Sequence, residues 1–371
     1  MLVYGVTFDH NTNYGSCMQA YALQTVIEKM QIKGEKCQYR LIPVCSFRDC
    51  PKLGHGLAKI AMRLKSYRNA LQFRSYHKNL MHYADVRSIP ELPSLNRTAD
   101  AFVCGSDVIW RQDLNRGLGA FYLDFAEKYA FSYAASFGIA TPNDEVRAFA
   151  APKIAALREI SVREQSGVEL VKEWTGRDAV LTADPVLLLE QEEWNRIAAL
   201  PEGKPASIFL YSTHPTPALE ETARALQLET GLPVDRNIWT LGIRDYLREG
   251  AKKVKSPQRW LQCLRDAEYV VTNSFHATVF SILFHKKFFT VVNGEPQEGA
   301  NIRMFDLLSR LGLADRIVND VPRNILLDTP DFTTADREIA VMREASLAFL
   351  RRNLEAAAEE AVSNKGGVRV C

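Results

Sequence analysis

Residues 270–282 carry the clearest structural pattern of the chain, and they read Val270-Val271-Thr272-Asn273-Ser274-Phe275-His276-Ala277-Thr278-Val279-Phe280-Ser281-Ile282. The short apolar run at the start predicts a buried strand, and the longer apolar run after the polar pair predicts a helix. Either Asn273 or Ser274 can cap that helix. A strand that leads directly into a helix is part of a βαβ unit, so this stretch predicts an α/β fold with a parallel sheet.

The turn at Asn273 and Ser274 is also a candidate binding site. Ligands of open α/β sheets bind at the carboxyl ends of the strands. The first turn of a helix offers free backbone N–H groups and a positive dipole end, which suit an anion. His276 falls in that turn, where its side chain can reach the same anion. The alternative is a buried histidine that is hydrogen-bonded to a backbone carbonyl, and the local pattern leaves both interpretations open.

Similar strand patterns recur on both sides of this stretch. Short apolar runs alternate with helical periodicities, and the runs lie at 2–8, 101–104, 131–136, 207–211, 268–272 and 288–292. At 371 residues the chain exceeds the size at which one hydrophobic core usually keeps growing. We therefore predict two Rossmann-like α/β domains that face a cleft, formed by residues 1–195 and 203–330. A helical pattern at 334–362 predicts a long C-terminal helix that packs back on the first domain.

Two arginines at the ends of predicted elements are candidates for binding an anion. Arg163 follows the short strand at 159–162, and Arg303 lies in the first turn of a predicted helix. Arginine is permanently charged, and its guanidinium group pairs with two oxygens of a carboxylate or phosphate. The alternatives are a salt bridge between Arg163 and Glu164 and a surface position for Arg303.

Polar residues at two other strand ends suit a sugar. The loop before the first helix reads Asn13-Tyr14-Gly15-Ser16, in which glycine lets a ligand approach the backbone closely. Asp107 and Trp110 follow the strand at 101–104. Sugar hydroxyls need hydrogen-bond acceptors, and a pyranose face packs on an aromatic ring. Asp107 can equally be a helix N-cap and Trp110 an ordinary core residue.

The composition excludes several classes of function. The formal net charge is +2, which gives no support to nucleic-acid binding. The seven cysteines lack the spacing of a zinc site, so we expect no metal and a reducing compartment. No uncharged apolar stretch reaches the length of about 18 residues that a membrane span needs. These observations predict a cytoplasmic protein.

The segment 52–78 is locally basic. It contains no acidic residue, and its cations include Lys59, Arg63, Lys65, Arg68 and Arg74. Apolar residues are interleaved at near-helical spacing, which predicts a basic amphipathic helix. One interpretation is a solvated helix face, and the other is a peripheral contact with anionic lipid at the cytoplasmic face of a membrane.

Several segments together resemble the polysaccharide pyruvyltransferase family. They occur in family order from the first strand to about Leu313. The matching segments are Asn13-Tyr14-Gly15-Ser16, Gln19-Ala20-Tyr21-Ala22-Leu23-Gln24, Gly105-Ser106-Asp107 with Trp110, Tyr133-Ala134-Ala135-Ser136-Phe137-Gly138, Ser161-Val162-Arg163, Ala183-Asp184-Pro185, Asn273-Ser274-Phe275-His276 and Arg303. Ala277 stands where the family often has glycine. The predicted layout, two α/β domains with a terminal helix that folds back across them, is glycosyltransferase-B-like.

The resemblance also implies a reaction. Phosphoenolpyruvate would be the co-substrate, without a further cofactor, and its pyruvyl group would form a ketal with a sugar of a glycan or lipid-linked precursor in cell-surface polysaccharide biosynthesis. His276 would be the proton donor. The donor-binding residues would be Arg163, Asn273, Ser274 and Arg303. The acceptor-binding residues would be Asn13, Tyr14, Asp107 and Trp110. Asp107 is also the candidate for the base.

Two other functions fit the same architecture. A glycosyltransferase that uses a sugar nucleotide would need base and ribose contacts in the second domain, and the sequence offers no convincing set. A catalytically silent protein that binds glycan, or that organises an assembly complex, would have no need of His276, Arg163 and Arg303 together.

Overall fold

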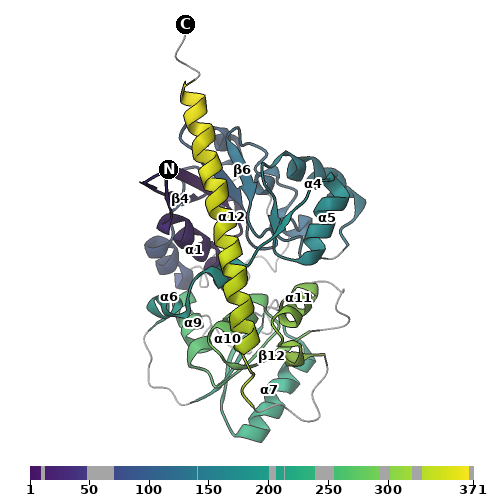
Figure 1. The fold of residues 1–371 in the computed structure, drawn as a ribbon. Helices are drawn as coiled ribbons and strands as arrows, with labels where there is room; N and C mark the ends of the chain where they lie inside the picture. The colour runs from purple at the N-terminus through teal and green to yellow at the C-terminus, as the bar shows by residue number, and fades with distance from the viewer. Residues whose placement is uncertain are drawn as a thin grey trace, which may run out of the picture.

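The computed structural model describes residues 1–9, 13–47, 71–139, 141–199, 206–212, 214–238, 255–292, 301–319 and 328–366. Two separate sheets with flanking helices form its two domains, as Figure 1 shows. The predicted fold class, two α/β domains with a long C-terminal helix, is confirmed. The polar stretch at 201–205 and residues 52–70 of the basic segment lie outside the described residues, so the domain boundary and the lipid contact stay predictions.

The N-terminal domain is built on a four-stranded parallel sheet of order β4-β1-β5-β6. Its strands are β1 (Leu2–Val6), β4 (Gln38–Leu41), β5 (Ala101–Cys104) and β6 (Tyr129–Ser132). Two smaller pairs are β2 (Gln31–Ile32) with β3 (Glu35–Lys36) and β7 (Ser161–Val162) with β8 (Val180–Leu181). The helices are α1 (Tyr14–Lys29), α3 (Gln112–Asn115), α4 (Asp144–Ala156), α5 (Gln165–Thr175) and α6 (Gln191–Ile197). β5 and β6 are buried along their whole length, as expected for parallel strands covered on both faces.

The C-terminal domain is built on a five-stranded parallel sheet of order β10-β9-β11-β12-β13. Its strands are β9 (Ile208–Ser212), β10 (Val234–Ile238), β11 (Tyr269–Thr272), β12 (Lys287–Val291) and β13 (Ile317–Val318). Its helices are α7 (Pro217–Thr230), α9 (Pro257–Asp266), α10 (Phe275–Leu283) and α11 (Ile302–Arg310). Every residue of α10 is buried, because this helix is apolar on all sides and lies between the sheet and the other domain.

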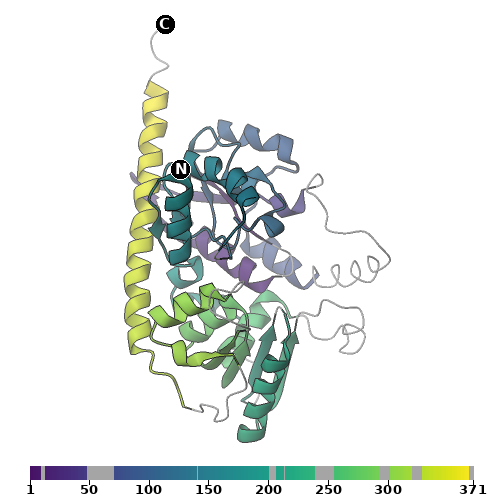
Figure 2. The same ribbon diagram turned by 90° about the vertical axis from the view of Figure 1, so that its right-hand side faces the viewer.

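The C-terminal helix α12 (Thr333–Gly366) runs along both domains, as the two views in Figures 1 and 2 show. Near its start, Asp336 Oδ1 lies 2.9 Å from Nε2 of His285 in the C-terminal domain. Further along, Asn353 Oδ1 accepts a hydrogen bond of 3.1 Å from the Tyr129 hydroxyl in the N-terminal domain. The helix therefore ties the two domains together. None of the helices that the structure describes combines the length and apolar composition of a membrane span.

A second contact between the domains lies at the start of α1. The Tyr14 ring is stacked on Trp260 of α9, with 5.1 Å between ring centroids and 1° between the ring planes. The Tyr14 hydroxyl donates a hydrogen bond of 2.9 Å to the carbonyl oxygen of Lys255. This packing brings the first turn of α1 against the C-terminal domain, where α10 begins.

Candidate functional site

The site is centred on His276, in the first turn of α10. The ring is buried, and Nε2 lies 3.4 Å from Oδ2 of Asp184, which is an ion-pair distance when the imidazole is protonated. Asn273 and Ser274 lie at the carboxyl end of β11, and Ser274 is the N-cap residue of α10. Asn273 donates from Nδ2 to the carbonyl oxygen of His214, while its buried Oδ1 has no partner in the described part of the chain. In the alternative interpretation of the sequence, His276 was a buried histidine hydrogen-bonded to a backbone carbonyl. In the structure its Nε2 instead lies near a carboxylate.

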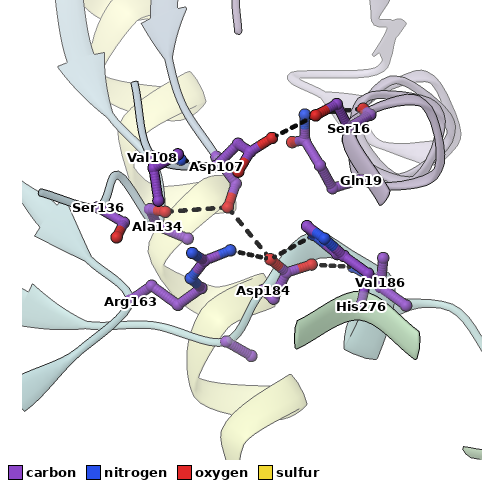
Figure 3. A network of polar contacts seen from close by, with 12 residues as sticks. Ser16, Gln19, Asp107, Val108, Ala134, Ser136, Arg163, Asp184, Val186 and His276 are labelled. Atoms are coloured by element: carbon purple, nitrogen blue, oxygen red, sulfur yellow. Dashed lines mark hydrogen bonds and ion pairs between the residues drawn. The ribbon is translucent and has the colours of Figure 1, made fainter. Parts of the chain in front are cut away.

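Asp184 lies at the centre of the polar network that includes His276 and Arg163, and only 1% of its side chain is exposed. It precedes the 3₁₀ turn Pro185–Leu188, and its Oδ1 accepts a hydrogen bond of 3.0 Å from the Val186 N–H. Its Oδ2 accepts a bond of 2.6 Å from Arg163 Nη1. Figure 3 shows Arg163 and His276 pointing at Asp184 from opposite sides. Burial by itself raises the pKa of Asp184, but His276, Arg163 and these hydrogen bonds outweigh burial and hold the pKa well below its ordinary value.

Arg163 follows β7, and 3% of its side chain is exposed. Its Nε donates to Glu164 at 3.0 Å and its Nη1 donates to Asp184, so the predicted pair with Glu164 is present. Its buried Nη2 has no hydrogen-bond partner among the described residues. Burial lowers the pKa of Arg163, and the carboxylates of Glu164, Asp184 and Asp107 outweigh burial and raise it. Arg163 is therefore charged and retains one unused donor.

Arg303 approaches from the other domain, in the first turn of α11. The guanidinium carbons of Arg163 and Arg303 lie 4.3 and 5.7 Å from the centroid of the Phe275 ring. The buried Nε of Arg303 has no hydrogen-bond partner within the described ranges. Burial and the nearby charge of Arg163 lower the pKa of Arg303 to about 10. Two like charges beside one ring, each with an unused N–H, form a site that an anion would stabilise.

Asp107 faces the same region from the N-terminal domain, after β5. Its Oδ2 accepts a hydrogen bond of 2.6 Å from Ser16 Oγ, and its Oδ1 accepts one of 2.8 Å from the Val108 N–H. Burial raises the pKa of Asp107, but the charges of His276 and Arg163 outweigh it, so the pKa is lowered and the carboxylate is ionised. The N-cap of the next helix, α3, is Arg111, so Asp107 is not a helix cap.

A cavity of about 320 Å³ brings most of the predicted site residues together. The predicted residues that line it are Asn13, Asp107, Asn273, Ser274, His276 and Arg303. Asn13 also caps α1, since its Oδ1 accepts a hydrogen bond of 3.2 Å from the Ser16 N–H. Arg163 lines a neighbouring cavity that shares Phe275 and Arg303 with the first, and Arg163 and His276 both contact Asp184.

Two residues predicted to bind the acceptor lie elsewhere. Trp110 is fully buried in the core of the N-terminal domain, where its ring stacks on Tyr122 with 6.0 Å between centroids. Tyr14 is 4% exposed, with its ring on Trp260. A ring that is enclosed by protein offers no face to a sugar. The prediction that Trp110 and Tyr14 bind the acceptor is therefore corrected: Trp110 is a core residue and Tyr14 joins the domains.

The sequence interpretation gave no role to Asp184, and it gave Gly15 only the role of letting a ligand approach the backbone. Asp184 stood in the segment Ala183-Asp184-Pro185, where an acidic residue at the end of a short strand was the available signal. Gly15 lies in the first turn of α1, where a Cβ added to it would lie 2.2 Å from Nδ1 of His276 and 2.6 Å from its Cγ. Glycine thus leaves the space that the His276 ring occupies.

Substitution of Gly15 by alanine is expected to displace His276. A Cβ at 2.2 Å from Nδ1 forces the ring to move, and a displacement of about 1 Å can cost up to about 100-fold in rate. We expect Gly15→Ala to lower turnover about 10- to 100-fold per folded molecule, with some loss of stability because the added Cβ overpacks a buried site. The matched control is Gly167→Ala in α5, where the added Cβ would lie 3.2 Å from Val162. Equal turnover of the two variants would contradict the prediction.

Comparison with known proteins shows which family the chain belongs to. No curated protein matches the chain. Among solved structures, the chain is similar to S. aureus MnaA in a co-structure with UDP, with 10% identity, a TM-score of 0.47, and coverage of 97% of this chain and 87% of that one. It is also similar to UDP-GlcNAc 2-epimerase from Neisseria meningitidis bound to UDP-GlcNAc, with 9% identity, a TM-score of 0.42, and coverage of 93% of this chain and 100% of that one.

The family model for polysaccharide pyruvyl transferase matches residues 13–295. That match runs from the loop after β1 past the end of β12 and includes His276, Asp184 and Arg163, and the chain belongs to the polysaccharide pyruvyl transferase family.

Proposed function

We propose that this protein transfers the pyruvyl group of phosphoenolpyruvate to two hydroxyls of a sugar, with formation of a cyclic ketal and release of phosphate. One observation carries the proposal. Two guanidinium groups with unused donors lie beside Phe275, next to a histidine in contact with an ionised carboxylate. Phosphoenolpyruvate offers two anionic groups for the arginines and an enol carbon that must be protonated. Membership of the family supports the same donor.

The donor would be bound by charge and by a helix end. Arg303 Nε and Arg163 Nη2 would donate to the phosphate and carboxylate oxygens. Asn273 and Ser274 lie at the N-terminus of α10, whose positive dipole end would add to the binding of an anion. Binding an anion would offset the repulsion between the two arginines.

The reaction would begin with transfer of a proton from His276 to the methylene carbon of the donor. The neighbouring carbon becomes an oxocarbenium-like centre, and a sugar hydroxyl attacks it and loses its proton. Phosphate departs with the proton that the first hydroxyl gave up, and attack by a second hydroxyl, which returns a proton to His276, closes the ketal. Asp107 lines the same cavity as His276 and is ionised, so it is the residue proposed to accept the first hydroxyl proton.

The acceptor would enter from the N-terminal domain. Asn13 and Asp107 line the His276 cavity on that side and offer oxygen acceptors to sugar hydroxyls. We propose a sugar of a surface-polysaccharide precursor as the acceptor, either free in a glycan or linked to a lipid.

Loss of Arg303 is expected to weaken binding of the donor without lowering the stability of the fold. Because its Nε has no partner in the described structure, Arg303→Met removes a buried charge without breaking a bond of that nitrogen. We expect the KM for phosphoenolpyruvate to rise about 10-fold or more, as for loss of a hydrogen bond to a charged group. The free energy of unfolding should stay equal or increase. Arg224→Met, at an exposed position of α7 in the same domain, is the control, and an unchanged KM in Arg303→Met would remove Arg303 from the donor site.

The reaction itself is tested by measuring phosphate release from phosphoenolpyruvate. The acceptors would be a panel of α- and β-linked galactosides, glucosides and N-acetylhexosamines. Release that depends on an acceptor, together with a product that is heavier by a pyruvate ketal, is the expected result. No release with any acceptor and no binding of phosphoenolpyruvate would overturn the proposal and favour a sugar-nucleotide enzyme or a silent binding protein.

A further inference from the structure

A second cavity lies on the other side of Phe275 and Arg303. Its volume is about 740 Å³, more than twice that of the His276 cavity at about 320 Å³. β8, α5, α11 and α12 contribute to its walls, so both domains and the C-terminal helix take part. Most of the wall is apolar, and the apolar residues are Leu181, Leu187, Phe275, Phe305, Leu307 and Met342. A cavity of this size falls in the range of about 300–1,000 Å³ that holds ligands larger than phosphoenolpyruvate.

Charged groups with unused hydrogen-bonding atoms line this apolar cavity. Arg163, with 3% of its side chain exposed, has an unpartnered Nη2, and Arg303 has an unpartnered Nε, as judged within the described residues. The carboxylates of Glu164 and Asp184 already accept from the other nitrogens of Arg163. Asp306 also lines the cavity, and its buried Oδ2 has no partner there either. Two unpartnered donors and one unpartnered acceptor thus face a head group, the apolar walls face the rest of a ligand, and the remaining polar lining residues are Gln165, Thr182, Ser309 and Arg310.

This combination selects a chemical class of ligand. A small, highly charged anion would use the arginines and leave the apolar walls in contact with water. An uncharged apolar molecule would fill the cavity and leave Nη2 of Arg163 and Nε of Arg303 buried without an acceptor, which is unfavourable. A phosphate monoester on an apolar chain satisfies both parts: its oxygens accept from Arg163 and Arg303, and in its singly protonated form its hydroxyl donates to Asp306.

We propose that the 740 Å³ cavity binds an amphiphilic anion, a phosphate monoester carried on a single apolar chain. The phosphate lies on Arg163 and Arg303, and the chain lies along Leu181, Leu187 and Met342. One consequence rests on the proposed function: because the donor uses the same two arginines, the amphiphile and phosphoenolpyruvate exclude each other. Such a ligand would regulate pyruvyl transfer by competition.

The test is a calorimetric titration of the full-length chain with the series from ethyl to octyl phosphate. Each methylene group buried should tighten binding about fourfold until the chain fills the cavity. Inorganic phosphate should bind most weakly, and octanol and octyltrimethylammonium should not bind. Equal affinity along the series, or equal binding of octanol, would overturn the proposal.

A pair of variants in β8 locates the ligand. Leu181 lines the cavity, whereas its neighbour Val180 does not and is 40% exposed. In Leu181→Asn the affinity for alkyl phosphates should depend less on the length of the alkyl chain, and in Val180→Asn this dependence should match the wild type. The same dependence in both variants would place the chain elsewhere and overturn the assignment.

The two proposals can fail independently. The titration needs no turnover, so absence of phosphoenolpyruvate binding would overturn the proposed function and leave the amphiphile site in place. If phosphoenolpyruvate binds but does not displace octyl phosphate, the two ligands do not share the arginines, and that part of the proposal is overturned. Flotation with vesicles that contain lysophosphatidic acid, a phosphate monoester with one acyl chain, identifies the source. Binding that octyl phosphate blocks indicates a membrane lipid, and tight octyl phosphate binding without flotation indicates a soluble phosphomonoester.

Discussion

His276→Gln is expected to lower turnover about 100-fold or more and to leave the fold intact. Glutamine has a similar reach but cannot transfer a proton as imidazole does, and general acid catalysis typically contributes about 10²- to 10⁴-fold. The ring lies in the first turn of α10, 3.4 Å from an ionised carboxylate, and lines the same cavity as Asp107 and Arg303. The measurement is acceptor-dependent phosphate release with phosphoenolpyruvate as donor.

The control for this variant is His285→Gln. His285 belongs to the same domain, follows α10 and is half-exposed, with Nε2 2.9 Å from Asp336. Its loss should leave turnover within about twofold of the wild type, since a surface ion pair contributes little. Near-normal turnover of folded His276→Gln would show that another group protonates the donor.

Asp184→Asn is expected to cause the largest loss of stability. The asparagine would keep the shape of the side chain, but Arg163 and His276 would lose the charge that they share. Removing one partner of a buried ion pair typically costs about 3–5 kcal/mol. We expect a decrease of this size in the free energy of unfolding at pH 7, measured by urea denaturation. Asp178→Asn, at an exposed pair with Lys172, should change it by less than about 1 kcal/mol.

The same variant gives a prediction for pH. Although burial opposes it, the cations hold the pKa of Asp184 in the folded state below its ordinary value of 3.8. The stability that Asp184 contributes is therefore fully present above the ordinary pKa and is lost as the pH falls from there towards the folded-state pKa. The difference between wild type and Asp184→Asn should be constant near neutral pH and shrink in acid. A difference that grows on acidification would contradict this account.

We expect Asp184 to position His276, and kinetics can distinguish that role from a purely structural one. If Asp184 orients His276, the folded fraction of Asp184→Asn should show lower turnover and a shifted pH profile, and Asp184→Glu should recover part of the activity. A variant that is only less stable would keep the wild-type turnover and pH profile per folded molecule.

The strands and helices that position the site were predictable from local pattern. β11 and α10 follow from an apolar run, a polar pair and a second apolar run, and His276 in the first helical turn follows with them. The burial of Trp110 was not predictable, because an indole after a strand end suits both a sugar and a core. The role of Asp184 was also missed, since its partner His276 lies far away in the sequence, in the other domain.

By itself, the sequence determined the α/β class, the helix end that carries His276, and the presence of arginines at two element ends. These features depend on hydrophobic periodicity and on residue type, which act over a few neighbouring residues. Only the tertiary structure decided that Arg163 and His276 share Asp184, that Arg303 joins Arg163 beside Phe275, and that Gly15 makes room for His276. Contacts between charged groups from two domains depend on how the two sheets pack against each other, and no local pattern encodes that distance.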